Sequence, residues 1–294
     1  MTDWSPDMTD RSVMCYCVGV MATIETASGP IAYDEQGTGS PVVLLPSGAH
    51  DRHDFDELRA LLPPRFRTIA LDWPGHGSSP LGEEPASAMR FADVTEQIVE
   101  QLAPQGAIVV GNSVGGFSAA RLAIRRPELV KGLVLVASGG FGGRPPHVRA
   151  VCALMAQPWF LRRVYPAFSA HYMRARTPAD RRVRDVGVAT TRHDPGLRAV
   201  TELWRSFSSP EHDLRREAVS ITAPTLLIWG RKDPVTPLRV GKKITATIPG
   251  SELVVLESGH VPHTTDPEAF AGHLIPFADA AVSGSPTRPS TAAV

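Results

Sequence analysis

Short apolar runs recur along the chain and alternate with segments of helical periodicity. The runs VVLL, TIAL, AIVV, LVLV, TLLI and LVVL are apolar almost throughout. A strand needs this composition when helices cover both faces of its sheet. The alternation therefore predicts an α/β fold with a mostly parallel, doubly wound sheet and right-handed crossovers.

Eight segments have the length and composition expected of strands. They are 22–27, 30–35, 41–46, 67–72, 106–111, 132–137, 224–229 and 252–256. The helices expected between them are 54–62, 89–103, 114–126, 236–247 and 266–281. Ser28, Gly29 and Pro30 join the first two strands, which favours an antiparallel hairpin at one edge of the sheet.

Residues 141–220 interrupt this alternation. They contain no strand-like run, several short helical patterns and most of the large aromatic side chains. The segment lies between the strands predicted at 132–137 and 224–229. We interpret it as a helical cap inserted into an α/β core of residues 21–140 and 221–282, where it would cover the ends of the strands.

The two ends of the chain differ from the core in composition. An early apolar stretch, VMCYCVGVMAT, has the character of a signal sequence, but three aspartates precede it where a signal peptide carries positive charge. Because Met21 begins the strand pattern, we interpret residues 1–20 as a disordered leader or the product of an upstream start codon. Residues 283–294 are rich in Ser, Pro, Thr and Ala and are also expected to be disordered.

Composition narrows the classes of partner. The 294 residues carry 30 basic and 30 acidic side chains, so the net charge gives no reason to expect nucleic acid or an acidic membrane surface. No apolar run reaches the roughly 18–20 residues of a membrane span. Cys15, Cys17 and Cys152 form neither a disulfide framework nor a zinc-binding spacing. We expect a cytoplasmic protein that acts on a small molecule without cofactor or metal; the oligomeric state stays open.

The strand predicted at 106–111 runs directly into Gly111-Asn112-Ser113-Val114-Gly115. This G-x-S-x-G pattern is typical of a tight strand-to-helix turn that exposes a nucleophilic serine. Glycine is needed at its two ends because a Cβ atom there would collide with the neighbouring chain. A serine hydroxyl is a poor nucleophile by itself, so the pattern gains meaning only if an acid and a histidine accompany it.

Both partners follow in the chain, each on a loop after a predicted strand. Asp233 lies in WGRKDPVTP after 224–229, and His260 lies in ESGHVPHTTDP after 252–256. The carboxyl ends of strands are where open α/β sheets bind ligands. The order Ser113, Asp233, His260 therefore predicts a catalytic triad.

With these motifs the chain resembles the capped branch of the α/β-hydrolase superfamily, from about Ile24 to Val282. DWPGHGSS is similar to the family's D-x-P/R-G-x-G-x-S loop, and GHVPHTTDPEAF is similar to its G-H-x-x-x-x-x-x-P-x-x-F ending. The resemblance implies that Ser113 is the nucleophile, His260 the general base and Asp233 the residue that orients it. Capped epoxide hydrolases and haloalkane dehalogenases use an aspartate at the elbow, so Ser113 argues against their chemistry.

The resemblance also implies an oxyanion hole made of two backbone N–H groups. One is that of Val114, directly after the nucleophile at a helix N-terminus. The other comes from a loop that usually reads His-Gly-x, where this chain has Pro46-Ser47-Gly48. The aligned donor is the N–H of Gly48.

Several further side chains are candidates for the substrate site or for a second site. We expect cap aromatic residues to line the pocket: Trp159, Phe160, Tyr165, Tyr172 and Trp204. A group of arginines in the predicted cap is interpreted as a solvated outer face. The alternative is a docking point for an anionic substrate group. The group consists of Arg162, Arg163, Arg174, Arg176, Arg181, Arg182 and Arg184.

Histidines other than His260 are candidates for further roles. The loop of Gly48 also contains His50, Asp51 and His53. These side chains are compatible with a metal site or a second acid–base site, although loop solvation and helix capping are the simpler interpretation. His263 is a rival general base, and His76 is interpreted as structural.

The prediction is a cofactor-independent serine hydrolase for an ester of a small, partly apolar carboxylic acid. One alternative is a carbon–carbon bond hydrolase of ring-cleavage products, since GNSVGG is similar to the GNSMGG elbow of that group. Against this alternative, Val261 follows His260 where that group usually has tryptophan. A cofactor-free haloperoxidase or perhydrolase is another alternative. The non-enzyme alternative is a hydrolase-like ligand receptor, which would normally tolerate the loss of a triad residue, whereas all three are present in this chain. The sequence does not indicate the physiological substrate.

Overall fold

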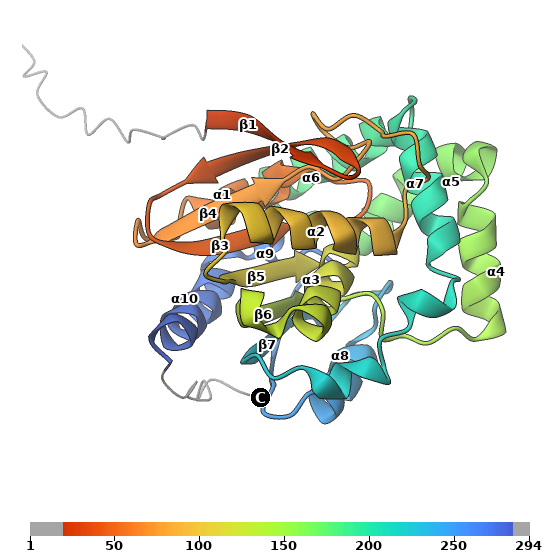
Figure 1. The fold of residues 1–294 in the computed structure, drawn as a ribbon. Helices are drawn as coiled ribbons and strands as arrows, with labels where there is room; N and C mark the ends of the chain where they lie inside the picture. Colours follow the sequence, from red (N-terminus) through yellow and green to blue (C-terminus); the bar gives the residue numbers. More distant parts are fainter. Residues whose placement is uncertain (1–19, 285–294) are drawn as a thin grey trace, which may run out of the picture.

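An eight-stranded sheet forms the centre of the molecule (Figure 1). The computed structural model describes residues 20–284. Its strands are β1 (Val20–Thr26), β2 (Gly29–Gln36), β3 (Ser40–Leu45), β4 (Phe66–Leu71), β5 (Ala107–Asn112), β6 (Val130–Val136), β7 (Thr225–Gly230) and β8 (Glu252–Leu256). Their spatial order is β1-β2-β4-β3-β5-β6-β7-β8.

Six of these strands pair in parallel, from β4 to β8, while β1 and β2 form the predicted antiparallel hairpin at the edge. The predicted fold class is therefore confirmed. Parallel pairing places the ends of β5, β7 and β8 along one edge of the sheet, so the three loops that carry the predicted triad leave from the same side.

Helices cover both faces of the sheet, as the apolar strands require. Val43 and Leu45 of β3 face a core shared with α2 (Ala88–Leu102), α3 (Val114–Arg125) and α8 (Leu238–Thr247). The alternate residues Val42 and Leu44 face the second core, which is shared with α1 (Asp56–Arg59) and α10 (Pro267–Ser283). Side chains alternate along a strand, so each strand contributes to both cores.

Four helices lie between β6 and β7 in the chain and group at one end of the sheet in Figure 1. They are α4 (Pro146–Met155), α5 (Pro158–Met173), α6 (Pro178–Thr190) and α7 (Gly196–Ser206). Tyr172 and Met173 of α5 pack against Val261, which follows β8. The segment interpreted as a cap thus contacts the core beside the predicted catalytic histidine.

The helix predicted at 54–62 is shorter than expected. The structure has a 3-10 turn, η1 (Arg52–Phe55), followed by α1, which ends at Arg59. The side chain of Asp51 begins this turn by accepting a hydrogen bond from the N–H of His53. The remaining short elements are η2 (Pro127–Leu129), η3 (Pro210–His212), η4 (Glu217–Ser220) and α9 (Pro262–Thr265).

The predictions for the chain ends fall almost wholly outside the described residues. β1 begins at Val20 and α10 continues to Ser283, one position into each predicted disordered end. Between residues 20 and 284, no helix combines the length and the apolar character that crossing a membrane requires.

Candidate active site

Ser113 occupies a strained turn between β5 and α3. Its φ of 56° and ψ of −112° lie outside the regions favoured by non-glycine residues. A Cβ atom on Gly111 would lie 2.2 Å from the carbonyl oxygen of Gly115, and one on Gly115 would lie 2.3 Å from that of Leu45. The two glycines therefore permit the backbone approach that the elbow needs. Ser113 makes no side-chain hydrogen bond that would cap α3.

Asp233 and His260 form a buried pair at the ends of β7 and β8. His260 Nδ1 lies 2.7 Å from Asp233 Oδ2, and both side chains are almost fully buried. Asp233 Oδ1 also accepts hydrogen bonds from the backbone N–H groups of Val235 and Thr236, at 2.8 and 3.1 Å. The hydroxyl of Thr236 lies 2.7 Å from Asp233 Oδ2 and 3.0 Å from the carbonyl oxygen of Ala137, so its one hydrogen is shared between two acceptors. These donors satisfy the carboxylate independently of the histidine.

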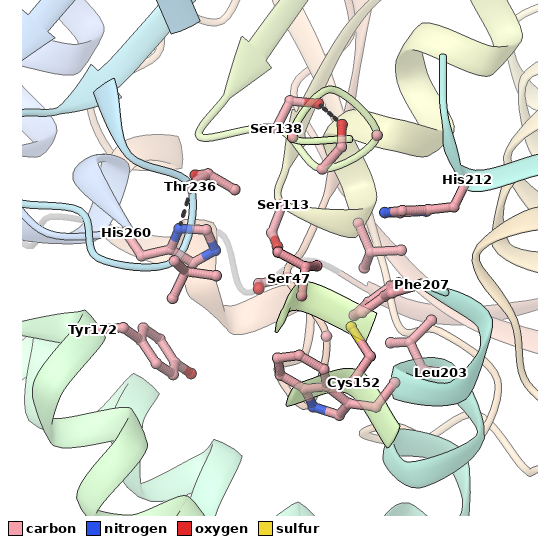
Figure 2. Close-up of a pocket in the computed structure, with 18 of the residues that line it drawn as sticks. Ser47, Ser113, Ser138, Cys152, Tyr172, Leu203, Phe207, His212, Thr236 and His260 are labelled. Carbon is pink, nitrogen blue, oxygen red and sulfur yellow. Dashed lines mark hydrogen bonds between the residues drawn. The ribbon is translucent and has the colours of Figure 1, made fainter. Parts of the chain in front are cut away.

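Hydrogen bonds with residues of β5 and α5 fix the position of His260. The side-chain amide of Asn112, next to Ser113, donates to the carbonyl oxygen of His260 at 3.0 Å. The N–H of His260 donates to the carbonyl oxygen of Tyr172 at 3.0 Å. Figure 2 shows the imidazole of His260 facing the hydroxyl of Ser113. Asn112 and Thr236 were missed by the sequence analysis, although Asn112 lies within the elbow motif itself.

Ser113 and His260 line a cavity of about 170 Å³, with Asp233 behind the histidine. Gly48 and Val114, the predicted oxyanion donors, line the same cavity. The N–H of Val114 is the first of α3, where no preceding helical carbonyl can accept it. The structure thus brings the triad candidates and both oxyanion candidates to one site.

Contacts beneath the Gly48 loop hold its backbone. The indole N–H of Trp73 donates to the carbonyl oxygen of Pro46 at 2.9 Å. The N–H of Ala49 donates to Nε2 of His76 at 3.1 Å, and His76 Nδ1 donates to the carbonyl oxygen of Pro74 at 3.0 Å. Burial lowers the pKa of His76 to about 4, so the ring stays neutral and can accept from Ala49. These contacts support a structural role for His76.

Three of the five predicted pocket aromatics line the cavity: Tyr165, Tyr172 and Trp204. The predictions for Trp159 and Phe160 are wrong. Trp159 is 70% exposed, and neither residue is part of the cavity lining. Residues spaced by three or four positions share one face of a helix, and on α5 that face carries Tyr165, Phe168 and Tyr172. Trp159 lies on another face, where it contacts only Phe160 among aromatic rings of the described chain.

His212 is a pocket residue that the sequence did not single out. It lines the cavity opposite His260 (Figure 2) and stacks between Phe117 and Phe207, with ring centroids 4.6 and 4.9 Å away. Burial lowers its pKa to about 4, so it is neutral near pH 7.

His50 is not a solvated loop residue, contrary to the simpler interpretation. It is fully buried, and its ring nitrogens lie 2.8 Å from Asp54 Oδ2 and 2.6 Å from the hydroxyl of Tyr172. Asp51 and His53 do have the expected capping and surface roles: Asp51 caps η1, and His53 pairs with Asp56 at the surface. Residues 20–284 contain no group of three His, Cys, Asp or Glu side chains placed to bind a metal ion.

His263 and the seven arginines singled out from the sequence lie outside the cavity. His263 is buried and stacks on Phe55 at 4.4 Å, and neither of its ring nitrogens has a partner within residues 20–284. Apart from the half-buried Arg184, the arginines are exposed, in keeping with a solvated face: Arg162, Arg163, Arg174, Arg176, Arg181 and Arg182. None of the seven lines the cavity.

Comparison with known proteins identifies the family. Residues 40–267 match the family model described as the alpha/beta hydrolase fold. A pimeloyl-[acyl-carrier protein] methyl ester esterase of Vibrio vulnificus is 27% identical over 261 residues, which cover 85% of this chain and 99% of the relative. The esterase of that name from Neisseria meningitidis serogroup C is 30% identical over 78% of this chain and 90% of its own.

A solved structure gives the same result. The crystal structure of a hydrolase from Pseudomonas aeruginosa superposes with a TM-score of 0.77 at 27% identity and covers 88% of this chain and 98% of that one. The prediction of a hydrolytic enzyme is confirmed by these relatives. The chain belongs to the α/β-hydrolase fold family.

Proposed function

We propose that this enzyme hydrolyses a carboxylic ester through an acyl-enzyme formed on Ser113, with His260 as general base and Asp233 as the residue that orients it. One observation carries the proposal. The buried Asp233–His260 pair, at 2.7 Å, presents its ring to a cavity that also contains Ser113 on its strained elbow. The esterase activity of the curated relatives supports an ester as substrate.

In the acylation step, Ser113 Oγ attacks the ester carbonyl carbon while His260 Nε2 takes the hydroxyl proton. The tetrahedral intermediate then collapses, the bond to the alcohol oxygen breaks, and His260 returns the proton to that oxygen. Water repeats the sequence on the acyl-enzyme and releases the acid and free Ser113. Asp233 accepts a hydrogen bond from Nδ1 throughout, which keeps Nε2 directed toward the serine.

The N–H groups of Val114 and Gly48 are proposed to bind the oxyanion of each tetrahedral intermediate. Val114 adds the partial positive charge of the α3 N-terminus. A lost oxyanion donor raises the barrier by about 3 kcal/mol in a serine hydrolase. The contacts of Pro46 and Ala49 with Trp73 and His76 hold the Gly48 backbone in place before substrate binds.

The lining of the cavity supports a small, partly apolar substrate. Apolar side chains from the α4–α7 segment and the loop after it form much of its wall: Val148, Cys152, Phe168, Leu203, Trp204 and Phe207. We therefore propose that these helices act as the cap, with an acyl or alcohol chain lying beneath them. The seven arginines singled out from the sequence lie away from this wall, whereas Arg144, just before α4, lines the cavity.

Active-site labelling and ester hydrolysis test the proposal together. A fluorophosphonate probe should label the wild type but not Ser113→Ala, and the same variant should lose hydrolysis of p-nitrophenyl acyl esters by a factor on the order of 10⁴ or more. Ser138→Ala is the matched control, because Ser138 lines the same cavity but its hydroxyl donates to the carbonyl oxygen of Gly139. Labelling that persists in Ser113→Ala would disprove the assignment. A vinylogous diketone acid hydrolysed a thousandfold faster than any ester would show carbon–carbon cleavage instead.

A further inference from the structure

A second buried hydrogen-bonded chain lies beside the proposed triad and has no part in the mechanism above. It runs from Asp54 to His50, then to the hydroxyl of Tyr172 and on to that of Tyr165, with successive distances of 2.8, 2.6 and 2.9 Å. All four side chains are at most 3% exposed. Gly187 of α6 lies over the chain, where a Cβ atom would approach the hydroxyl of Tyr165 to 3.0 Å.

The Asp54–His50 pair has the character of a group that retains a proton. Asp54 Oδ1 is buried and has no hydrogen-bond partner among the described residues, so a lone carboxylate charge there would be costly. Burial raises the pKa of Asp54. Burial also acts to lower the pKa of His50, but the adjacent carboxylate outweighs it and the pKa is raised. The buried, unpartnered Oδ1 favours the protonated form of the pair, in which His50 Nε2 carries a hydrogen whether the second proton rests on Asp54 or on Nδ1.

The hydrogen on His50 Nε2 determines whether the hydroxyl of Tyr172 can donate its own hydrogen to a ligand. His50 Nε2–H donates to the phenol oxygen of Tyr172, and the hydroxyl of Tyr165 can donate to the same oxygen from its other side. With Tyr165 as the donor of this pair, both acceptor positions of the Tyr172 oxygen are occupied, and the hydrogen of Tyr172 has no protein acceptor in this chain of contacts. Burial raises the pKa of both tyrosines, so the hydroxyls stay protonated.

The hydroxyl of Tyr172 is also placed to meet a substrate. Tyr172 and Tyr165 both line the cavity of Ser113. Figure 2 shows the ring of Tyr172 near His260, with its hydroxyl directed toward the cavity. The rings of Tyr172 and His260 are 5.6 Å apart and nearly perpendicular. In a wall made largely of apolar side chains, one oriented donor would discriminate strongly between substrates.

We propose that Tyr172 donates a hydrogen bond to an oxygen atom of the substrate other than the scissile carbonyl, and that His50 and Asp54 hold its hydroxyl in that role. The preferred ester would then carry a second acceptor oxygen, such as a ketone, ether or ester oxygen, in its acyl or alcohol part. Tyr172 is the specificity-determining residue, and His50 and Asp54 are positioning residues. The inference rests on the proposed function for the identity of the substrate as an ester.

Ligand binding to an inactive variant tests the proposed hydrogen bond of Tyr172 without relying on turnover. In Ser113→Ala, two matched ester pairs are titrated by calorimetry: p-nitrophenyl levulinate against pentanoate, and methoxyethyl against butyl benzoate. We expect the oxygen-bearing member of at least one pair to bind about tenfold more tightly, as one buried hydrogen bond allows. Adding Tyr172→Phe should bring that ratio close to one. Tyr33→Phe on β2, outside the cavity lining, is the matched control and should keep the ratio.

The double variant His50→Leu with Asp54→Leu tests the positioning role, since removing both partners leaves no isolated buried charge. It should reduce the ratio by about threefold while thermal unfolding stays cooperative. Equal affinities in both pairs, or a ratio that survives Tyr172→Phe, would overturn the proposal. A loss of affinity that is equal for both members of a pair would mean that Tyr172 is purely structural. Fluorophosphonate labelling that persists in Ser113→Ala would refute the proposed function but leave the binding ratio to decide this inference.

Discussion

Two buried aspartate–histidine pairs lie close to one cavity and have nearly the same internal geometry. The Nδ1–Oδ2 distance is 2.7 Å in Asp233–His260 and 2.8 Å in Asp54–His50. The hydroxyl of Ser113 lies beyond His260 (Figure 2), and the hydroxyl of Tyr172 lies 2.6 Å beyond Nε2 of His50.

The pairs differ in what surrounds the carboxylate. Asp233 receives hydrogen bonds from Val235 and Thr236 as well as from His260, whereas Asp54 Oδ1 has no partner within residues 20–284. Several donors hold the Asp233 carboxylate in place beside the histidine that is proposed to take up and release a proton. In the second pair one carboxylate oxygen is buried without a partner, which favours a proton held within the pair. The comparison indicates that additional donors distinguish a pair suited to acid–base cycling from one suited to a fixed hydrogen bond.

The largest expected contrast is between Asp233→Asn and Asp54→Asn. In the proposed triad, the Asp233→Asn amide would favour the wrong tautomer of His260, and kcat for a p-nitrophenyl ester should fall by a factor on the order of 10⁴. Asp54→Asn should lower kcat by less than about tenfold, because no proton moves through that pair during the reaction. Steady-state kinetics of both variants provide the measurement. Comparable losses in the two variants would show that the Asp54–His50 pair also takes part in the reaction, and the proposed difference between the pairs would then be wrong.

His50 and His260, one from each pair, both act electrostatically on His263. The protonation of His263 therefore gives a pH-dependent test of the buried region. Burial, with smaller effects from His50 and His260, lowers its pKa to about 3. The unfolded chain binds this proton below about pH 6.5 while the folded chain does not, so the free energy of unfolding falls as the pH drops. Burial also lowers the pKa of His76 and His212 to about 4 each, which adds to the loss. Asp51 acts in the opposite sense between pH 3.8 and about 6, because burial raises its pKa.

His263→Leu should therefore reduce the loss of stability between pH 7 and pH 5 by about 2 kcal/mol. Urea unfolding at the two pH values measures it. His53→Leu is the control, because the hydrogen bond with Asp56 raises the pKa of His53 and its removal cannot reduce the acid loss. An unchanged difference between the two pH values in His263→Leu would mean that this ring is protonated in the folded state.

The smallest expected effect concerns the additional donors to Asp233. Thr236→Val removes the hydroxyl that lies 2.7 Å from Asp233 Oδ2, and kcat/KM for the ester should fall about tenfold, as expected for one hydrogen bond to a charged group. Thr265→Val is matched in chemistry, because the Thr265 hydroxyl donates to Asp180 at 2.9 Å, away from the cavity. Only the first variant should slow catalysis. Equal rates in the two variants would show that the extra donor does not distinguish the pairs.

The strands and the elbow could be predicted because their signals are local. An apolar run with flanking turn residues indicates a buried strand, and G-x-S-x-G indicates a tight turn, without reference to distant residues. The order of Ser113, Asp233 and His260 needed only the positions of three strand ends. Helix phase was harder to predict between β6 and β7. Trp159 and Tyr165 are both aromatic and lie six residues apart on α5, but only Tyr165 lines the cavity.

The sequence by itself determined the α/β class, the elbow and the residues available for a serine hydrolase, because these depend on periodicity and on turn geometry over a few positions. The tertiary structure decided which side chains meet across long separations. His50 and Tyr172 are 122 positions apart, and Asn112 and His260 are 148 apart. No local pattern encodes such contacts, because they form only when strand pairing and helix packing bring the loops together. For the same reason His50 had the appearance of a loop residue in the sequence, whereas in the fold it is a buried partner of Tyr172.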